Sequence, residues 1–226
     1  MGLDIIILCG GEGKRLRPLT EEIPKPMVLI NGKPIVHYII KHLEKYNINN
    51  YIFATGYKSQ IIEKYLNNNY SKLNFLTVFS GNVDIIKRIQ DSLNYVKNDF
   101  LILYGDTISN VDINKLTDFN FNNKQHVTMT LYKYKSEFGL VEIDKNFKVI
   151  SFSEKPILEK YINIGYFFFR KSFADIIHNY SSWEEFIESI VVQNSMSGYI
   201  HNDLHITVNT VDELRNAENE IKKLNL

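Results

Sequence analysis

The first half of the chain alternates short apolar runs with amphipathic segments. Residues 4–8 form a β-branched apolar run that closes at Gly10-Gly11, as expected of a strand buried on both faces of a sheet. After Pro34, apolar side chains recur every three or four positions from Ile35 to Leu43 and predict a helix. Further strands are expected at 51–55, 73–79 and 100–104, and helices at 59–66 and 86–96. This alternation predicts βαβ units, a mostly parallel sheet and right-handed crossovers.

The second half has a different pattern, in which strands follow one another directly. Strands are expected at 127–134, 140–143, 149–152 and 162–169, and a turn at 144–146 joins the middle two into a hairpin. Two helices follow, each with a capping-box pair: Ser182 with Glu185, and Thr210 with Glu213. No repeat and no linker rich in Pro, Gly or Ser interrupts the pattern. The sequence therefore predicts one α/β domain over residues 1–226 with a continuous mixed sheet.

The composition excludes partners that are held by a broad electrostatic field. The 226 residues include 26 Lys and Arg and 26 Asp and Glu, so the formal net charge is zero. Generic binding to nucleic acid or to an anionic membrane is not expected, and any anion must be held locally. The single cysteine, Cys9, can form no disulfide within the chain. With no apolar run long enough for a bilayer and no signal peptide, a cytoplasmic protein is predicted.

The first expected strand leads into a glycine-rich loop that is followed by cations. Residues 10–13 read Gly-Gly-Glu-Gly, which allows a tight turn with backbone N–H groups facing a ligand, and Lys14, Arg15 and Arg17 follow. A Walker A loop is excluded because Arg15 stands where Ser or Thr is required. A dinucleotide fingerprint is excluded because Leu16 replaces its third glycine. The loop alone is equally consistent with phosphate binding and with an ordinary turn.

Two more positions carry candidate chemistry. Lys25 lies between Pro24 and Pro26, which restrict the backbone and so fix the place of its ammonium group, although such a tripeptide alone is more often a plain loop. Asp106 follows the strand at 100–104, and a carboxylate at the C-terminal end of a parallel strand faces the crevice where open α/β sheets bind ligands. The alternative role of Asp106 is to begin a turn with Gly105.

Together, residues 10–20 and 24–27 resemble the signature of sugar-phosphate nucleotidyltransferases. The resemblance implies a Rossmann-like fold whose nucleotide-binding half is roughly 1–110 and whose acceptor-binding half is roughly 111–226. It implies that Arg15 and Lys25 hold a nucleoside triphosphate and, with Asp106, are catalytic. The nucleotide-binding positions that it implies are Leu8, Cys9, Gly10, Gly11, Glu12, Gly13, Lys14, Gly56, Ser80, Gly81 and Gly105.

The same resemblance implies a Mg²⁺ ion with Asp106 as one ligand. Magnesium suits phosphate chemistry because it bridges phosphate oxygens while one or two carboxylates and several waters hold it. A second aspartate is expected before the last helix, but Asn209 occupies that place. On this reasoning Asn209 is equally a metal ligand or a residue that begins a helix, and Asp212 is a weaker candidate because it falls inside the expected helix.

Three later segments resemble the acceptor-binding segments of the family: 138–139, 153–156 and 162–166. The resemblance implies that Gly139, Glu154, Lys155 and Asn163 contact a small phosphorylated acceptor, with Lys155 facing its phosphate. The expected reaction is in-line attack of an acceptor phosphate oxygen on the α-phosphorus, with pyrophosphate leaving. Because a phosphate is already ionised at pH 7, this chemistry needs no general base and no His or Cys nucleophile.

The segment 78–89 separates the branches of the family. It lacks the glycine-rich stretch of thymidylyl- and uridylyltransferases, and Ser80-Gly81 with Lys87-Arg88-Ile89 resembles the glucose-1-phosphate cytidylyltransferase branch, so CTP is the expected donor. Bulky residues at 82–86 disfavour a hexose 1-phosphate. Overall similarity to the cytidylyltransferases of capsular phosphoramidate synthesis suggests L-glutamine phosphate as the acceptor.

Several alternatives stay open. The chain could be a sugar-1-phosphate cytidylyl- or guanylyltransferase, or a nucleotide-binding regulator without activity. A glycosyltransferase shares the fold class, but residues 106–108, Asp-Thr-Ile, lack the second acid of an Asp-x-Asp motif. Assembly into a homo-oligomer is also left open by the sequence.

Overall fold

A computed structural model describes residues 2–224, and its centre is a seven-stranded sheet. The strand order is β12-β8-β11-β6-β1-β4-β5. β1 (Leu3–Cys9), β4 (Ile48–Thr55), β5 (Phe75–Phe79) and β6 (Phe100–Tyr104) run parallel, which confirms the predicted βαβ half. β11 (Ile157–Phe169) is antiparallel to β6 and to β8 (Val127–Lys135), and β12 (Met196–Ile200) is parallel to β8.

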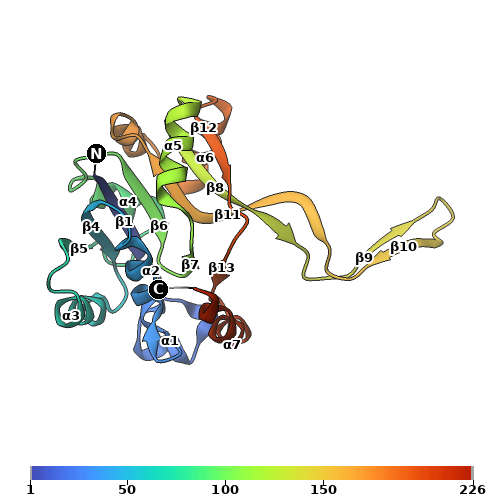
Figure 1. Ribbon diagram of the computed structural model, residues 1–226, viewed down its shortest axis with the longest axis horizontal. Helices are drawn as coiled ribbons and strands as arrows, with labels where there is room; N and C mark the ends of the chain where they lie inside the picture. Colours follow the sequence, from blue (N-terminus) through green and yellow to red (C-terminus); the bar gives the residue numbers. More distant parts are fainter. Residues whose placement is uncertain (1, 225–226) are drawn as a thin grey trace.

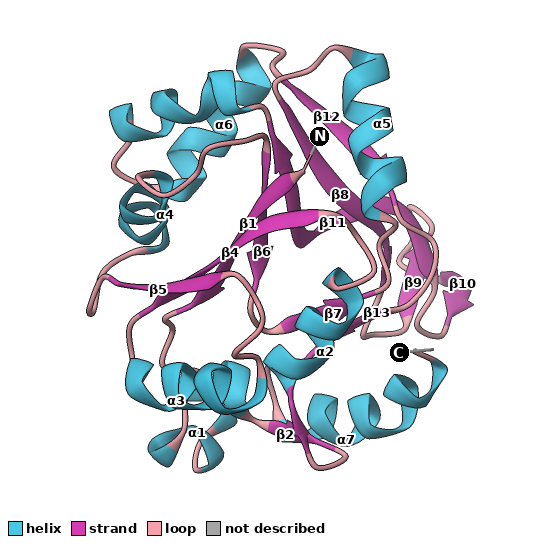
Figure 2. Ribbon diagram, turned by 60° about the vertical axis from the view of Figure 1, so that its left-hand side comes forward, coloured by secondary structure: helices cyan, strands magenta, loops and turns pink. Residues whose placement is uncertain are grey.

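Helices cover both faces of this sheet (Figure 2). On one face, Ile5 and Ile7 pack with α2 (Ile35–Leu43), α3 (Ser59–Asn69), α5 (Ile113–Asn123) and α7 (Val211–Glu220). On the other face, Ile6 packs with α4 (Ile85–Leu93), the 3₁₀ segment η3 (Lys171–Asn179) and α6 (Trp183–Val192). β1 is therefore buried on both faces, as its continuous apolar run predicts.

The helix caps form at the predicted residues, whereas some element boundaries differ from the prediction. Ser182 Oγ accepts a hydrogen bond from Glu185 N at 3.0 Å, and Thr210 Oγ1 accepts one from Glu213 N at 3.2 Å, so both predicted N-caps are confirmed. The boundaries shift by a few residues. β5 begins at Phe75 rather than at 73, because Leu73 closes a turn on Tyr70. α4 ends at Leu93 rather than at 96.

Short elements surround the sheet and shape one edge of it. Around the glycine loop lie η1 (Lys14–Leu16), α1 (Leu19–Glu22) and η2 (Lys25–Met27), followed by the pair β2 (Leu29–Ile30) and β3 (Lys33–Pro34). β7 (Thr107–Ser109) pairs with β13 (His205–Thr207), and η4 (Ile221–Lys223) follows α7. None of the helices in residues 2–224 is both long and apolar enough to cross a bilayer.

The predicted hairpin exists but does not belong to the central sheet. β9 (Leu140–Ile143) and β10 (Val149–Ser153) pair only with each other in the described part of the chain. Figure 1 shows them at the end of a long projection from β8 and β11. The expectation of one continuous mixed sheet is wrong for this segment, because alternation along a strand predicts pairing without saying which sheet receives it.

Candidate active site

The candidate site lies at the C-terminal ends of β1 and β6. The two strands pair in parallel with Leu8 opposite Tyr104, so the glycine loop that follows β1 and the Asp106 turn that follows β6 leave the same edge of the sheet. Gly105 N donates to Leu8 O at 3.0 Å and fixes this arrangement. A Cβ on Gly105 would lie 2.5 Å from the same oxygen, so only glycine allows the two chain segments this close. This edge is where open α/β sheets bind ligands.

Four polar side chains from distant parts of the sequence meet at this edge. The ammonium group of Lys25 contacts the Asp106 carboxylate and donates to Asn209 Oδ1 at 2.8 Å. Arg15 Nη2 donates to the same Asn209 oxygen at 2.9 Å. Lys25 is 12% exposed and Asp106 30%, so the pair is only partly screened by water. The structure therefore brings together the three residues expected to be catalytic, with Asn209 between the two cations.

Packing against the glycine loop holds Lys25 in place. Lys25 opens a 3₁₀ turn after Pro24, so the two flanking prolines restrict its backbone as predicted. Gly13 has φ of 63°, and a Cβ there would lie 3.0 Å from Lys25 Cβ and 3.1 Å from Thr20 Cγ2. Thr20 Oγ1 donates to Gly13 O at 2.8 Å and locks the end of the loop. The loop and Lys25 thus form one packed unit.

Tertiary pairing brings Asn209 to Asp106. β13 lies antiparallel to β7 with Thr207 opposite Thr107, and Val208 N donates to Asp106 O at 3.4 Å. Asn209 N donates to Glu213 Oε2 at 2.6 Å, so the first turn of α7 also fixes this position. Asp212, the weaker metal candidate, instead pairs with Arg215 on the exposed side of α7 at 3.3 Å.

Two adjoining cavities open beside these side chains, of about 330 and 460 Å³. Gly10, Gly11, Lys25, Val83, Arg88 and Asp106 line both. The smaller also touches Leu8, Cys9, Tyr104 and Gly105, while the larger also touches Glu12, Gly13, Lys14, Arg15 and Asn209. The smaller cavity is therefore mostly apolar and the larger one is polar and cationic, as a base and a phosphate chain would require.

Arg88 is the important residue of this site that the sequence reasoning did not assign to it. It is 5% exposed, and it donates to Thr55 O at 2.6 Å, to Gly81 O at 3.2 Å and to Val83 O at 3.1 Å. Burial lowers the pKa of its guanidinium. A cation within the apolar stripe of an amphipathic helix is the signal that could have found it.

Arg88 packs closely against two of the glycines at this site. A Cβ on Gly10 would lie 1.8 Å from Arg88 Nη1, and one on Gly56 would lie 2.4 Å from it, whereas a Cβ on Gly81 would meet nothing within 4 Å. Contact of Gly56, Ser80 and Gly81 with a nucleotide stays a prediction. Ser80 Oγ is buried in the adjoining turn without a hydrogen-bond partner.

Of the remaining side chains near the loop, Cys9 is buried, whereas Lys14 and Arg17 are exposed. Cys9 is 1% exposed, and burial raises the pKa of its thiol well above the usual range, which agrees with the expectation of no cysteine nucleophile. Lys14 and Arg17 are exposed and both approach Glu12 Oε2, at 3.4 and 3.5 Å. These exposed pairs contribute little to stability and leave both cations able to turn to a bound anion.

The four expected acceptor-binding residues do not all reach this site. Asn163 Oδ1 accepts from Gly165 N at 2.7 Å, and Gly165 lies against the ring of Tyr104, which lines the smaller cavity. Gly139, Glu154 and Lys155 instead lie on the projection that carries β9 and β10 (Figure 1). Gly139 faces Phe152 and Glu154 of the same projection. Contact of these three with an acceptor stays a prediction.

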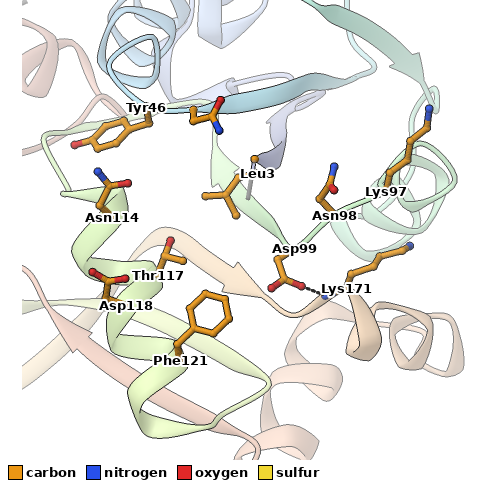
Figure 3. A pocket seen from close by; sticks show the side chains of 12 residues that line it. Leu3, Tyr46, Lys97, Asn98, Asp99, Asn114, Thr117, Asp118, Phe121 and Lys171 are labelled. Atoms are coloured by element: carbon orange, nitrogen blue, oxygen red, sulfur yellow. Dashed lines mark hydrogen bonds between the residues drawn. The ribbon is translucent and has the colours of Figure 1, made fainter.

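A larger cavity of about 620 Å³ lies at the opposite edge of the sheet. Leu3 and Asp99 there precede or begin strands, and residues of α5 such as Asn114 and Phe121 face them (Figure 3). The Asp99 carboxylate has partners within the fold, since it accepts hydrogen bonds from Lys171 N at 2.7 Å and from Arg170 Nη1 at 3.3 Å. Lys97 and Lys171 line it, but the glycine loop, Arg15 and Lys25 lie at the other edge, so the features of a phosphate site are gathered there instead.

Comparison with known proteins decides the family. The family model described as "Nucleotidyl transferase" matches residues 4–219, nearly the whole chain. The chain belongs to the nucleotidyl transferase family. It is therefore an enzyme that transfers a nucleotidyl group, and the site built from Arg15, Lys25 and Asp106 lies within the matched segment of this nucleotidyltransferase.

Individual relatives agree with this family. A D-glycero-alpha-D-manno-heptose 1-phosphate guanylyltransferase of Aneurinibacillus thermoaerophilus is 32% identical, over 97% of this chain and 99% of the relative. A probable glucose-1-phosphate cytidylyltransferase of Bacillus subtilis is 27% identical, over 92% of each. The fold matches a crystal structure of a putative glucose-1-phosphate thymidylyltransferase from Bacillus anthracis with a TM-score of 0.79, covering 100% of this chain and 97% of that one at 18% identity.

Proposed function

We propose that this nucleotidyltransferase transfers CMP from CTP to the phosphate of a small acceptor and releases pyrophosphate. The observation that carries the proposal is the convergence of Arg15, Lys25, Asp106 and Asn209 beside the glycine loop. Two cations on one amide oxygen, next to a carboxylate, give a site that can exchange its internal contacts for those of a metal-bound triphosphate.

The mechanism follows from the groups at this edge. An acceptor phosphate oxygen attacks the α-phosphorus of the nucleotide, and the bond from that phosphorus to the bridging oxygen of pyrophosphate breaks. Lys25, held against Gly13, and Arg15 place positive charge where negative charge develops on the phosphate oxygens. No protein group needs to take a proton, because the attacking oxygen is already ionised, so catalysis consists of positioning and charge neutralisation.

The oxygen atoms at the site fit a Mg²⁺ ion. Asp106 offers a carboxylate and Asn209 an amide oxygen, and residues 2–224 contain no group of three or more His, Cys, Asp and Glu side chains that could hold a metal ion. Magnesium suits such a site because it is held by one or two protein oxygens together with substrate phosphates and water. Asp106 and Asn209 would hold the ion, which would neutralise phosphate charge.

The smaller cavity offers a place for the base of the donor. Arg88 fills the space beside Gly10 and Gly56, and Val83 and Ile85 add apolar walls, so about 330 Å³ is left beside the loop. Arginine offers five N–H donors, of which three bond to carbonyl oxygens here. These bonds hold the guanidinium as one wall of the cavity, and the resemblance of residues 80–89 to cytidylyltransferases supports cytosine as the base.

We favour L-glutamine phosphate as the acceptor, which would give CDP-L-glutamine for capsule modification. Its support is the bulky segment 82–86, which disfavours a hexose 1-phosphate, and the overall similarity to the cytidylyltransferases of capsular phosphoramidate synthesis. The second candidate is guanylyl transfer to a sugar 1-phosphate. The 32% identity with the heptose 1-phosphate guanylyltransferase over nearly the full length of both chains favours it.

A pyrophosphate-release assay separates these functions. The purified protein is given each of four nucleoside triphosphates with Mg²⁺, crossed with sugar 1-phosphates and L-glutamine phosphate. We expect release with CTP and L-glutamine phosphate, and its loss when a chelator removes Mg²⁺. Preference for GTP and a heptose 1-phosphate would replace the first candidate by the second. Binding of CTP without release for any acceptor would instead support a regulator.

A further inference from the structure

Residues 136–156, here called the arm, form a unit that is joined to the body only at its base. Ser136 N donates to Pro156 O at 2.9 Å and closes the base, while Asp144 Oδ1 accepts from Asn146 N at 2.8 Å and Lys148 N at 3.0 Å and closes the tip. In the described part of the chain, the hydrogen bonds of the arm all stay within it. Figure 1 shows the arm standing clear of the helices and the central sheet.

The register of the arm gathers apolar side chains on one face. Val149 lies opposite Ile143 and Phe152 lies opposite Val141, and the bulge between residues 149 and 151 brings both pairs to the same face. The other face carries the pairs Ser151 with Glu142 and Ser153 with Leu140, so it is the more polar of the two, and the exposed Ile150 lies in the bulge. The arm is thus an amphipathic two-stranded ribbon with no layer against its apolar face.

The arm exposes a large amount of apolar surface. The four residues of the apolar face are 53–63% exposed, and Phe138 and Phe147 near its ends are 73% and 83% exposed. With about 200 Å² for a phenylalanine side chain, the three phenylalanines of the arm alone expose about 400 Å². That is half of the ~800 Å² that each partner contributes to a stable interface. A two-stranded hairpin without a covering layer is also marginally stable in water.

The surface fits a second copy of the same chain. The arm carries Glu137, Glu142, Asp144 and Glu154 against Lys145, Lys148 and Lys155, so its charge is nearly balanced and favours no strongly charged partner. An amphipathic ribbon can be self-complementary about a twofold axis, because identical apolar faces can pack against each other. Because the arm projects from the body, two copies can meet there without contact between their bodies (Figure 1).

We propose that the arm is a dimerisation element, in which the apolar face of one arm packs against the apolar face of the arm of a second copy. The two ribbons form a two-layered sheet that buries Val141, Ile143, Val149 and Phe152 of each chain.

The test is the mass of the full-length protein by sedimentation velocity over a wide concentration range. The wild-type chain is expected to sediment as a species of twice 26.4 kDa. Val149→Lys and, independently, Ile143→Lys place a charge in the apolar interface and should each raise the dissociation constant of the dimer about tenfold or more. Ser151→Lys is the matched control, because it adds the same charge to the same strand on the opposite face, beside Glu142, and should leave the dimer intact.

Hydrogen exchange at the arm gives a second readout that does not depend on mass. Amides of β9 and β10 should exchange more slowly in the dimer than in the Val149→Lys monomer. A wild-type chain that is monomeric at every concentration would overturn the proposal. So would a dimer that survives both Val149→Lys and Ile143→Lys, and so would dissociation caused equally by Ser151→Lys.

Discussion

At the scale of single residues, Lys25 contacts three separate parts of the chain. Its ammonium group meets Asp106 and Asn209, which come from positions about 80 and 180 residues further along the chain. Its aliphatic stem packs against Gly13. The side chain is polar at its tip and lies at the edge of a cavity, so truncating it removes charge from the site without opening a hole in the apolar core.

We expect Lys25→Ala to lower the rate of pyrophosphate release by about 10²–10³, which is typical for the loss of one group that stabilises a phosphoryl or oxyanion transition state. The free energy of unfolding should change by less than about 1 kcal/mol. Lys41→Ala is the control, because Lys41 lies on the exposed surface of α2 with Glu44 at 2.6 Å. Wild-type turnover in Lys25→Ala would contradict the assignment of Lys25 to catalysis.

Arg88 should affect both stability and nucleotide binding. Lysine cannot reproduce the planar fork that reaches Thr55, Gly81 and Val83, so Arg88→Lys leaves buried carbonyl groups without donors. We expect a loss of about 1–3 kcal/mol in the free energy of unfolding, measured by urea denaturation, and a raised KM for the nucleotide. Lys87→Ala changes the neighbouring exposed position, which pairs with Asp91, and should change neither the free energy of unfolding nor the KM by much. Equal effects of the two changes would refute this role.

At the scale of elements, the loop between β1 and η1 packs against Lys25, which we propose to be catalytic. Gly13 and Gly32 both have positive φ, of 63° and 78°, but only Gly13 has Lys25 against it, and a Cβ on Gly32 would meet nothing within 4 Å. Alanine at either position carries the same kind of backbone strain, about 1–2 kcal/mol. The two glycines therefore form a matched pair that separates backbone strain from displacement of Lys25.

Gly13→Ala and Gly32→Ala should lower the melting temperature to a similar degree, since both place alanine in the left-handed region. Only Gly13→Ala should also lower kcat for pyrophosphate release, because its Cβ would push Lys25 or Thr20 out of place. Steady-state kinetics beside thermal denaturation distinguishes the two effects. A kcat that is unchanged in Gly13→Ala, or equally lowered in both variants, would show that the loop does not position Lys25.

For the whole molecule, buried histidines join its two halves and make folding sensitive to pH. His42 Nε2 bonds to Val111 O at 2.9 Å, and His201 Nε2 lies 3.1 Å from Ser109 Oγ. Burial lowers the pKa of both. Burial, with His201 nearby, lowers the pKa of His205 to about 4. Because the unfolded chain binds protons to these groups more readily than the folded protein, stability falls as pH falls from about 6.5 towards 4.

We expect His205→Gln to flatten this part of the pH–stability curve, because it removes a group whose protonation favours the unfolded chain. Because the pKa of His205 is about 4 in the folded protein, the wild type should lose about 2–3 kcal/mol of its free energy of unfolding as the pH falls from about 6.5 to 4. Urea denaturation at a series of pH values measures it. His178→Gln replaces an exposed histidine and should leave the slope unchanged. An unchanged slope in His205→Gln would rule out His205 as the source.

Most of the fold could be read from local patterns, because each depends on neighbours in the chain. The apolar run 4–8, the helical stripe after Pro34 and the N-caps at Ser182 and Thr210 all lie where the sequence places them. The glycine loop and Lys25 were likewise predictable, since turn chemistry and a proline-restricted backbone are encoded locally. The position of the 140–153 hairpin outside the central sheet could not be predicted, because alternation along its strands predicts a ribbon but not which surface packs against it.

The sequence by itself determined the α/β class, the family and the residue types available for binding phosphate. Only the tertiary structure decided that Asn209 lies between Lys25 and Arg15, and that Arg88 fills the space beside Gly10 and Gly56. These contacts join residues far apart in the chain, so they follow from strand order and from the pairing of β7 with β13 rather than from any local pattern. Spacing along a chain fixes which face of an element a side chain occupies, and packing between elements fixes what that side chain meets.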